Sequence, residues 1–316
     1  MAGEVSIDIG AVARVARLIG PVIKDMDLDD FTDPRYYPPP GDDPESAARY
    51  FYFMVAIDHR TSRHGPFEGH VDGEFYHGAD LLYRLGKKAY VEDPDFFSPE
   101  RMVRIMPEDI AEWLRADGAM IWDPEVRAAL LRDAAEKLIK YYGGRVTNLI
   151  EASGNRLKRD LSPTGFIQRL RPILPYSDPV EKKAHLLAKF LSRRGILQHR
   201  DPWNEEVPVD NHLTRIALRT GIVQLHGELK QKVARGDEVS DEEDIKIRQA
   251  VKQAYKLMAR AANARPYILD DYLWTHGRKT CTHGKPKCHK CPLRKACKAH
   301  KTNQYTEEHA WWGYYY

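Results

Sequence analysis

The chain has 316 residues, a formal net charge of +3 at pH 7 and only four cysteines, so it is long enough to bury a sizeable core in two lobes. It contains no apolar run of membrane length and no signal-peptide core, so we expect a soluble, intracellular, cytoplasmic protein rather than a membrane or secreted one. The small net charge excludes a chain that binds nucleic acid as a general polycation.

Helical patterns dominate the chain. An amphipathic segment is followed by an acidic, proline-rich stretch and then by an aromatic apolar segment, at 9–26, 25–45 and 46–57. A short hairpin is expected over 68–77, with Asp72-Gly73 as its turn. Further helices, several of which begin with proline, are expected at 79–85, 99–105, 107–116, 124–142 and 166–174. Ser240-Asp-Glu-Glu243 is a capping box before a helix over 245–264. No sustained alternation supports a large sheet, so the predicted fold class is mostly α.

The four cysteines stand close together as Cys281-x6-Cys288-x2-Cys291-x5-Cys297. Four thiols in so short a window indicate a metal site. Structural zinc sites usually pair two short cysteine knuckles across a longer loop, whereas here only one pair is close. Zinc remains an alternative as the bound metal. Disulfides are disfavoured because nothing else in the sequence suggests secretion.

The same region is basic. Residues 272–301 carry nine Lys/Arg and no Asp/Glu, a pattern that favours contact with a phosphate backbone. The alternative is that these charges only solubilise a small metal-binding loop. The candidate phosphate contacts are Arg278, Lys279, Lys285, Lys287 and Lys290.

The cysteine spacing resembles the iron–sulfur loop of the endonuclease III type of DNA glycosylase. The stretch before it, Tyr272-Leu-Trp-Thr-His-Gly-Arg-Lys-Thr-Cys281, resembles that family's approach to its first ligand. The resemblance covers roughly residues 165–300. It implies a helix-hairpin-helix glycosylase with a two-lobed helical core, a [4Fe-4S] cluster in its C-terminal loop, and modified or damaged DNA as the partner in base excision repair.

Asp210 is the first catalytic candidate. The segment Val207-Pro-Val-Asp210-Asn-His212 precedes an apolar-periodic helix, so Asp210 is predicted to be its N-cap. The segment also resembles the Val-Asp-Thr-His motif of the glycosylases, whose aspartate faces the sugar. That implies a carboxylate that stabilises the oxocarbenium-like state at C1′, with Asn211 and His212 as candidate substrate contacts.

Lys183 is the second candidate. Asp178-Pro-Val-Glu181 reads as a capping box, with Asp178 as N-cap of the helix that follows. Lys183 then falls on the apolar face, where burial and the helix N-terminus would favour a neutral, nucleophilic amine. The family resemblance implies attack on C1′ and a Schiff base that permits lyase activity. Snorkelling of Lys183 and use of Lys182 instead remain alternatives.

The chain departs from the family at the hairpin. Leu174-Pro-Tyr-Ser-Asp-Pro179 has no glycine where the family has Leu-Pro-Gly-Val-Gly, which binds a DNA phosphate through backbone N–H groups. The archaeal 8-oxoguanine glycosylases, which the lysine and aspartate region also resembles, share this departure. The candidate substrate-binding residues are Tyr176 and Asp178 in this stretch and Phe51 in the aromatic segment 46–57.

Residues 75–160 also resemble the queuosine-salvage nucleoside glycosylases, through Phe75–Leu85, Asp93–Phe97 and Gly143–Asn155. Three hypotheses follow. The leading one is a DNA N-glycosylase, with or without an associated lyase activity. The second is a 7-deazaguanine nucleoside or nucleotide N-glycosidase. The third is a non-catalytic iron–sulfur nucleic-acid-binding protein.

Two further patterns have weaker implications. Four histidines, at 59, 64, 70 and 77, crowd a loop with Asp58 and Asp72, which suggests a polar loop over the base pocket more than a second metal site. The aromatic tail is expected to pack back on the protein, although stacking on unpaired bases is the alternative.

We expect a monomer with a terminal helix and acidic linker, a helical lobe, a catalytic helical lobe, the cluster region and the tail, at 1–45, 46–177, 178–265, 266–304 and 305–316.

Overall fold

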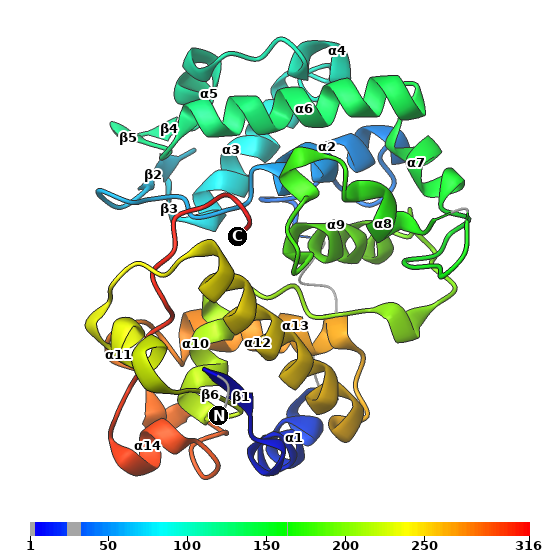
Figure 1. The fold of residues 1–316 in the computed structure, drawn as a ribbon. Helices are drawn as coiled ribbons and strands as arrows, with labels where there is room; N and C mark the ends of the chain where they lie inside the picture. Colours follow the sequence, from blue (N-terminus) through cyan, green and yellow to red (C-terminus); the bar gives the residue numbers. More distant parts are fainter. Residues whose placement is uncertain (1–3, 24–32, 163) are drawn as a thin grey trace. The chain divides into compact units, whose positions relative to one another are not determined.

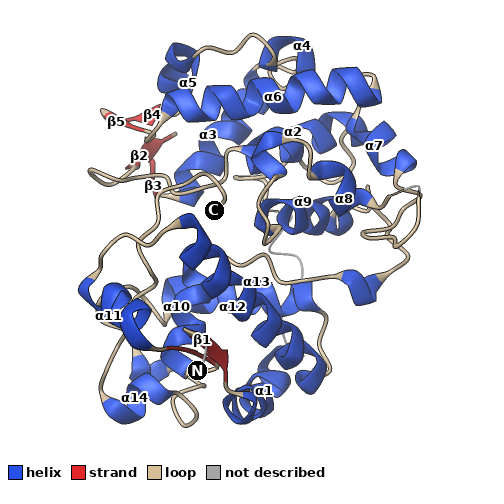
Figure 2. Cartoon of the chain, in the orientation of Figure 1, coloured by secondary structure: helices blue, strands red, loops and turns tan. Residues whose placement is uncertain are grey.

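The computed structural model describes residues 4–23, 33–162 and 164–316, so the expected acidic linker is described only from residue 33 on. Helices dominate the described residues, with only short two-stranded pairings (Figure 2), which confirms the mostly α fold class. The chain forms two compact units. Unit 1 combines the N-terminal segment up to residue 28 with residues 205–313, and unit 2 combines residues 29–204 with 314–316. The stretch 178–265, expected as one lobe, is therefore divided between the two units.

Unit 1 contains the N-terminal elements and the later part of the chain. Its elements are β1 (Val5–Ile7), α1 (Ile9–Ile23), α10 (Asn211–Thr220), β6 (Val223–Leu225), α11 (Gly227–Arg235), α12 (Asp241–Ala262), α13 (Pro266–Lys279), η4 (Cys288–Lys290) and α14 (Lys298–Thr302). Strand β1 pairs antiparallel with β6, which joins the start of the chain to the segment after α10. Helix α1 packs against α12 (Figure 1), and α10 packs against α12, α13 and α14.

The caps of unit 1 follow from local sequence. The capping box before α12 is confirmed, because Ser240 Oγ accepts from the Glu243 N–H and the Glu243 carboxylate accepts from the Ser240 N–H. Helix α10 ends at Gly221, whose φ of 81° suits a residue without a Cβ. This places the start of α10 at Asp210 and its end beside the cysteine region.

Unit 2 contains more helices than unit 1 in the described residues. Its elements are α2 (Pro44–Ala56), β2 (Glu68–Val71), β3 (Glu74–His77), α3 (Ala79–Glu92), α4 (Pro99–Met102), α5 (Pro107–Trp113), β4 (Arg115–Ala116), β5 (Ala119–Met120), α6 (Pro124–Tyr142), α7 (Val146–Ala152), α8 (Phe166–Leu170), η2 (Leu174–Tyr176), α9 (Lys182–Arg193) and η3 (Pro202–Asn204). Helix α2 is the central element, since α3, α6, α7 and α9 all contact it. It is buried along almost its whole length, so its C-terminal end is held in the core.

Two hairpins in unit 2 have the same turn chemistry. The predicted hairpin is confirmed, with β2 and β3 joined through Asp72 and Gly73 at positive φ. A second hairpin, β4–β5, turns at Asp117-Gly118 and ends α5 at Trp113, earlier than expected. Helix α8 also ends early, at Leu170, and Pro172, two residues later, has no N–H to continue the helical hydrogen bonds. No helix among the described residues is long and apolar enough to cross a membrane.

Candidate active site and metal centre

Asp210 occupies the N-cap of α10, as predicted. Its Oδ1 accepts from the Leu213 N–H at 2.9 Å, and its backbone C=O accepts from the Thr214 hydroxyl at 2.8 Å. Within the described part of the chain, no donor bonds its second carboxylate oxygen, Oδ2. One oxygen therefore fixes the helix while the other is left for a different partner.

The two residues after Asp210 are tied to the rest of unit 1. Arg215 Nη2 donates to His212 Nδ1 at 2.9 Å, and Asn211 Nδ2 donates to Glu308 Oε1 at 3.3 Å. Burial lowers the pKa of His212, with the nearby Asp210 carboxylate opposing it, so the imidazole is neutral at pH 7. A Cβ added at Gly277 would lie 2.8 Å from His212 Cβ, so the glycine of the His-Gly-Arg sequence allows α13 to approach α10.

Lys183 lies on the buried face of α9, as predicted, and its side chain is fully buried. Its Nζ donates to the Ala56 C=O at 2.6 Å, at the C-terminal end of α2, and lies 3.4 Å from His59 Nδ1. Burial and, next, the neighbouring Lys182 lower the pKa of Lys183 well below that of an ordinary lysine, although Asp58 opposes the shift. The lowered pKa favours the neutral form of this amine more than in an exposed lysine.

Lys182 is nearly as buried as Lys183 rather than turned clearly aside. Its Nζ donates to the Asp58 C=O at 2.9 Å and lies 3.4 Å from the Asp58 carboxylate. The two lysines therefore differ in partner: Lys182 is paired with a carboxylate, whereas Lys183 faces an imidazole and a carbonyl.

Asp178 is not the N-cap of α9, which corrects the sequence prediction. Helix α9 begins at Lys182, and its N-cap is Glu181 in the left-handed conformation with φ 64°. Asp178 instead accepts from the Val180 N–H and the Lys182 N–H, each at 2.9 Å. The Asp-Pro-Val-Glu run forms a tight turn before the helix, because Glu181 is in the left-handed conformation and breaks a regular first turn.

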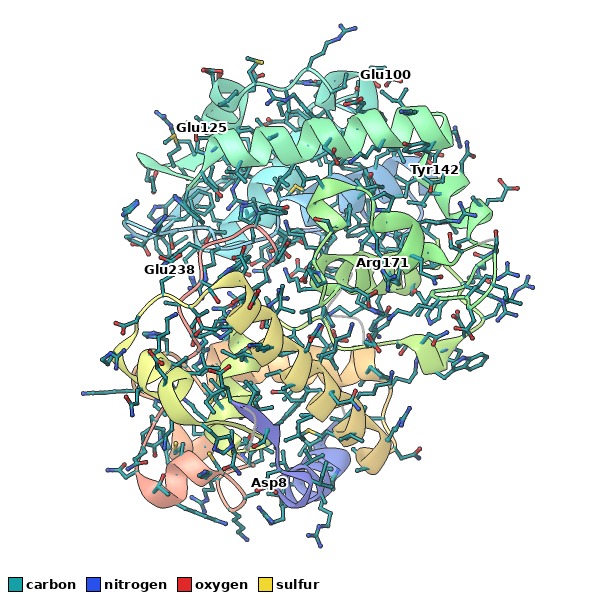
Figure 3. All side chains as sticks on the ribbon, viewed as in Figure 1. Asp8, Glu100, Glu125, Tyr142, Arg171 and Glu238 are labelled. Carbon is teal, nitrogen blue, oxygen red and sulfur yellow. The ribbon has the colours of Figure 1, made fainter. Side chains whose placement is uncertain are left out.

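The carboxylates of this turn already have partners within the protein. The Glu181 carboxylate pairs with Lys158 and Arg171, each at 2.7 Å (Arg171 is labelled in Figure 3). Where a glycine hairpin would present free N–H groups to a phosphate, Asp178 already accepts from the backbone.

Two candidate substrate contacts are core residues. The ring of Phe51 is fully buried and stacks on Phe190, with centroids 5.2 Å apart. Tyr176 is also fully buried, and its hydroxyl donates to the Tyr52 C=O at 2.5 Å. Neither ring is exposed for stacking on a base, because the aromatic face of α2 packs against α9 and η2 instead.

Sequence reasoning missed the network around Lys183. His59 Nε2 lies 3.0 Å from Asp123 Oδ2, and the Asp123 Oδ1 accepts from Arg127 Nε at 3.0 Å. Arg127 is fully buried and also donates to the C=O groups of Ile57 and Arg60. The only sequence signal was Asp123 before a proline with Arg127 four residues later; nothing in the sequence connects His59 to either.

The histidine loop shows no second metal site in the described residues. His59 pairs with Asp123, and His70 Nδ1 lies 2.6 Å from Asp117. Two groups of three potential metal ligands lie close together among the described residues, and neither contains a histidine of this loop.

The aromatic tail packs back onto the protein, as expected. In unit 1, Trp311 Nε1 donates to Asp241 Oδ1 at 2.8 Å. In unit 2, Tyr316 is buried and its C=O accepts from the Arg60 N–H at 3.3 Å.

The four cysteines follow α13, and none is in a disulfide. Polar groups are directed at three of the sulfurs, each 3.5 Å away: Arg219 Nη1 at Cys281, Tyr305 Oη at Cys288, and His276 Nε2 at Cys291. Burial raises the pKa of Cys291 to about 11, so a thiolate at this position needs a cation beside it. The donor set fits a thiolate-ligated metal centre.

Of the described residues, no three cysteine sulfurs lie within 4.8 Å of one another.

The basic candidates are largely exposed. Lys279, Lys285, Lys287 and Lys290 face solvent, and the Arg278 guanidinium lies 4.4 Å from the centroid of the Trp274 ring. Two acidic residues that follow the basic stretch pair with arginines of α10: Glu308 with Arg215 at 2.7 Å and Glu307 with Arg219 at 2.6 Å. These pairs hold α10 next to the segment that follows the cysteines.

The chain is similar to solved DNA glycosylase structures over almost its whole length. A thermostable thymine-DNA glycosylase matches with a TM-score of 0.50 and 15% identity, covering 93% of this chain and 100% of the other. Endonuclease III trapped as a covalent intermediate with DNA matches with a TM-score of 0.51 and 13% identity, covering 94% of this chain and 99% of the other. The fold is that of the helical DNA glycosylases.

An 8-oxoguanine DNA glycosylase from Pyrobaculum aerophilum matches with a TM-score of 0.49 and 14% identity, covering 96% of this chain and 99% of the other. No protein-family model matches the chain, and no curated protein matches it either. These comparisons therefore concern the architecture, and the roles of individual residues depend on their own chemistry.

Proposed function

We propose that this protein is an N-glycosylase that excises a modified or damaged base from DNA and that continues, through Lys183, as a lyase. The observation that carries the proposal is a fully buried lysine whose pKa is lowered by burial, at the start of a helix in a glycosylase fold. A neutral amine in such a place attacks carbon without first losing a proton to bulk water.

The proposal assigns a separate role to each of two side chains, Lys183 in unit 2 and Asp210 in unit 1. Lys183 Nζ forms a bond to C1′ as the C1′–base bond breaks, and the electron pair of that bond leaves with the base. Asp210 has a free carboxylate oxygen, and its proposed role is to stabilise the positive charge of an oxocarbenium-like sugar. The base must first leave the duplex stack, because neither atom of the scissile bond is accessible within it.

The cysteines have a structural role in this proposal. Cys281, Cys288, Cys291 and Cys297 would hold a [4Fe-4S] cluster, which when bound would order the basic loop rather than react with the base. Lys285, Lys287, Lys290, Arg278 and Lys279 would then contact phosphates, and DNA affinity would fall steeply as salt increases. Zinc in place of the cluster would leave that role unchanged.

The test is release of free base from a panel of modified-base oligonucleotides, followed by borohydride trapping. Wild-type protein should release base and form a covalent adduct, and Lys183→Ala should form none. Lys189→Ala, which alters another buried lysine of α9, is the matched control and should keep the adduct. An adduct that persists in Lys183→Ala but disappears in Lys182→Ala would transfer the role to Lys182.

A second function is favoured by one observation. Because Asp178 satisfies the backbone N–H groups before α9, the standard phosphate-binding hairpin is closed. A 7-deazaguanine nucleoside or nucleotide N-glycosidase would have no need of that hairpin. Including such nucleosides in the panel separates the two: base release from the nucleoside alone, with weak DNA binding and no dependence on Lys183, would favour the second function.

A protein that only binds nucleic acid is the third hypothesis. It predicts no base release from any substrate, and it is excluded if release occurs and is lost in Asp210→Asn while the fold is retained.

A further inference from the structure

We infer that His59 is a positioning residue for the nucleophile: its Nδ1 accepts the proton that Lys183 Nζ loses on attacking C1′, and Asp123 holds the imidazole in the tautomer that can accept it. This inference rests on the proposed function, which it deepens by assigning the proton acceptor of the lysine. All of the groups involved belong to unit 2.

The first step of the argument is geometric. The three groups form a chain, with Lys183 Nζ 3.4 Å from His59 Nδ1 and His59 Nε2 3.0 Å from Asp123 Oδ2. The side chain of His59 is fully buried, as is that of Lys183. An amine, an imidazole and a carboxylate in contact in sequence are suited to pass a proton away from the amine.

The second step concerns the tautomer. An ionised Asp123 accepts a hydrogen bond and donates none, so His59 Nε2 carries the hydrogen that bonds it. In the neutral ring, Nδ1 then has the lone pair, and it faces Lys183. A carboxylate that fixes an imidazole in this way sets which ring nitrogen is basic.

The third step is the support for the carboxylate. Arg127 Nε donates to Asp123 Oδ1 at 3.0 Å, and the same guanidinium donates to the C=O groups of Ile57 and Arg60 on either side of the histidine. One fully buried side chain therefore fixes both Asp123 and the backbone that carries His59. Such a support keeps the imidazole in place while the proton moves.

The charged groups that face His59 keep it neutral in the resting protein. Burial and, after it, the Arg127 guanidinium lower the pKa of His59 well below its usual value. Asp58, which pairs with Lys182 and accepts from the Tyr83 hydroxyl, and Asp123 are the facing acids. Burial raises the pKa of Asp123 to about 6, so the carboxylate is ionised above that pH.

The proton balance closes. When Nζ bonds to C1′ and the base leaves with its electron pair, the nitrogen becomes a cationic secondary amine. One proton passes from Nζ to His59 Nδ1, leaving a neutral amine on C1′ and an imidazolium that Asp123 stabilises. Opening of the sugar ring then gives the Schiff base, and the proton on His59 is available to the ring oxygen.

The closing experiment has two readouts. Long-range proton–nitrogen NMR of the full chain labelled with 15N-histidine, with His59 assigned by comparison with His59→Gln, should show a neutral ring protonated at Nε2. Single-turnover base release at pH 7.5 should fall on the order of 100-fold in His59→Gln, which keeps a polar side chain but accepts no proton. His226→Gln, which alters a histidine of unit 1 bonded to Ser6, should keep the wild-type rate.

The pH profile distinguishes proton transfer from a structural role. Wild-type release should decline as pH falls through about 6, where Asp123 gains a proton, and this decline should be absent from His59→Gln. Asp123→Asn, which can bond the ring without a negative charge, should be slow and should lack the same decline.

The outcomes separate the two proposals. An active wild type in which His59→Gln keeps the rate and the pH profile overturns the role of His59 and leaves the proposed function standing. A ring protonated at Nδ1, or charged at pH 7.5, overturns it even without any activity assay. A wild type that releases no base from any substrate overturns the proposed function and, with it, the proton transfer. A His59 ring protonated at Nε2 together with slow base release by His59→Gln supports both.

Discussion

Substitution of Asp210 separates its two functions, the helix cap and the proposed chemistry. The cap is the Leu213 N–H bond at 2.9 Å, and its loss in Asp210→Ala should cost about 1 kcal/mol of unfolding free energy. Asparagine caps about as well as aspartate and loses only the charge at the helix N-terminus. Asp210→Asn should therefore stay within about 0.5 kcal/mol of wild type.

The catalytic rates of the two variants should not follow their stabilities. Loss of a preorganised charge at the reacting centre costs on the order of 10²–10³ in rate, or about 2.7–4 kcal/mol. Asp210→Asn and Asp210→Ala should thus be almost equally inactive while differing in stability. The measurements are urea unfolding and single-turnover base release. Ser240→Ala, which removes the cap of α12 in the same unit, should lose stability without losing activity. An Asp210→Asn protein within threefold of the wild-type rate would refute the reasoning, because the carboxylate would then be only a cap.

Three further predictions concern other parts of the structure. Because the folded state holds Lys183 with a lowered pKa, the unfolded chain binds more protons, so the stability of the wild type should rise with pH until it levels off near 10.5. Lys183→Met should therefore be more stable than wild type at pH 7, with a difference in urea unfolding that shrinks toward pH 10; a difference that does not change with pH would contradict the assigned burial. Cys288→Ser should lose the visible absorbance and the iron, expected at about four irons per chain, whereas zinc in the purified wild type instead would refute the cluster. Asp178→Ala leaves two buried N–H groups without an acceptor and should cost about 1–3 kcal/mol in urea unfolding, and an unchanged midpoint would mean that the turn before α9 does not depend on it.

Local sequence was sufficient wherever the deciding contacts lie within a few residues. The cap at Asp210, the capping box at Ser240 and the hairpin turn at Asp72-Gly73 all depend on neighbours along the chain, and all three are confirmed. The cysteine spacing is likewise a local pattern. The turn before α9 was misread because a capping box and a tight turn at Asp178 use the same residue types, and the left-handed conformation of Glu181 that distinguishes them has no sequence signal.

The sequence by itself determined a mostly helical protein, a buried lysine on one helix, a capping aspartate on another and a cluster of thiols in a basic loop. It did so because helix periodicity and caps are set by residues no more than a few positions apart. Only the tertiary structure decided that His59 lies beside Lys183, 124 positions away in the chain, and that Asp123 and Arg127 orient it. It also decided that Phe51 and Tyr176 belong to the core and that the N–H groups before α9 are already satisfied. Such contacts depend on which helices pack together, and no spacing along the chain carries that information.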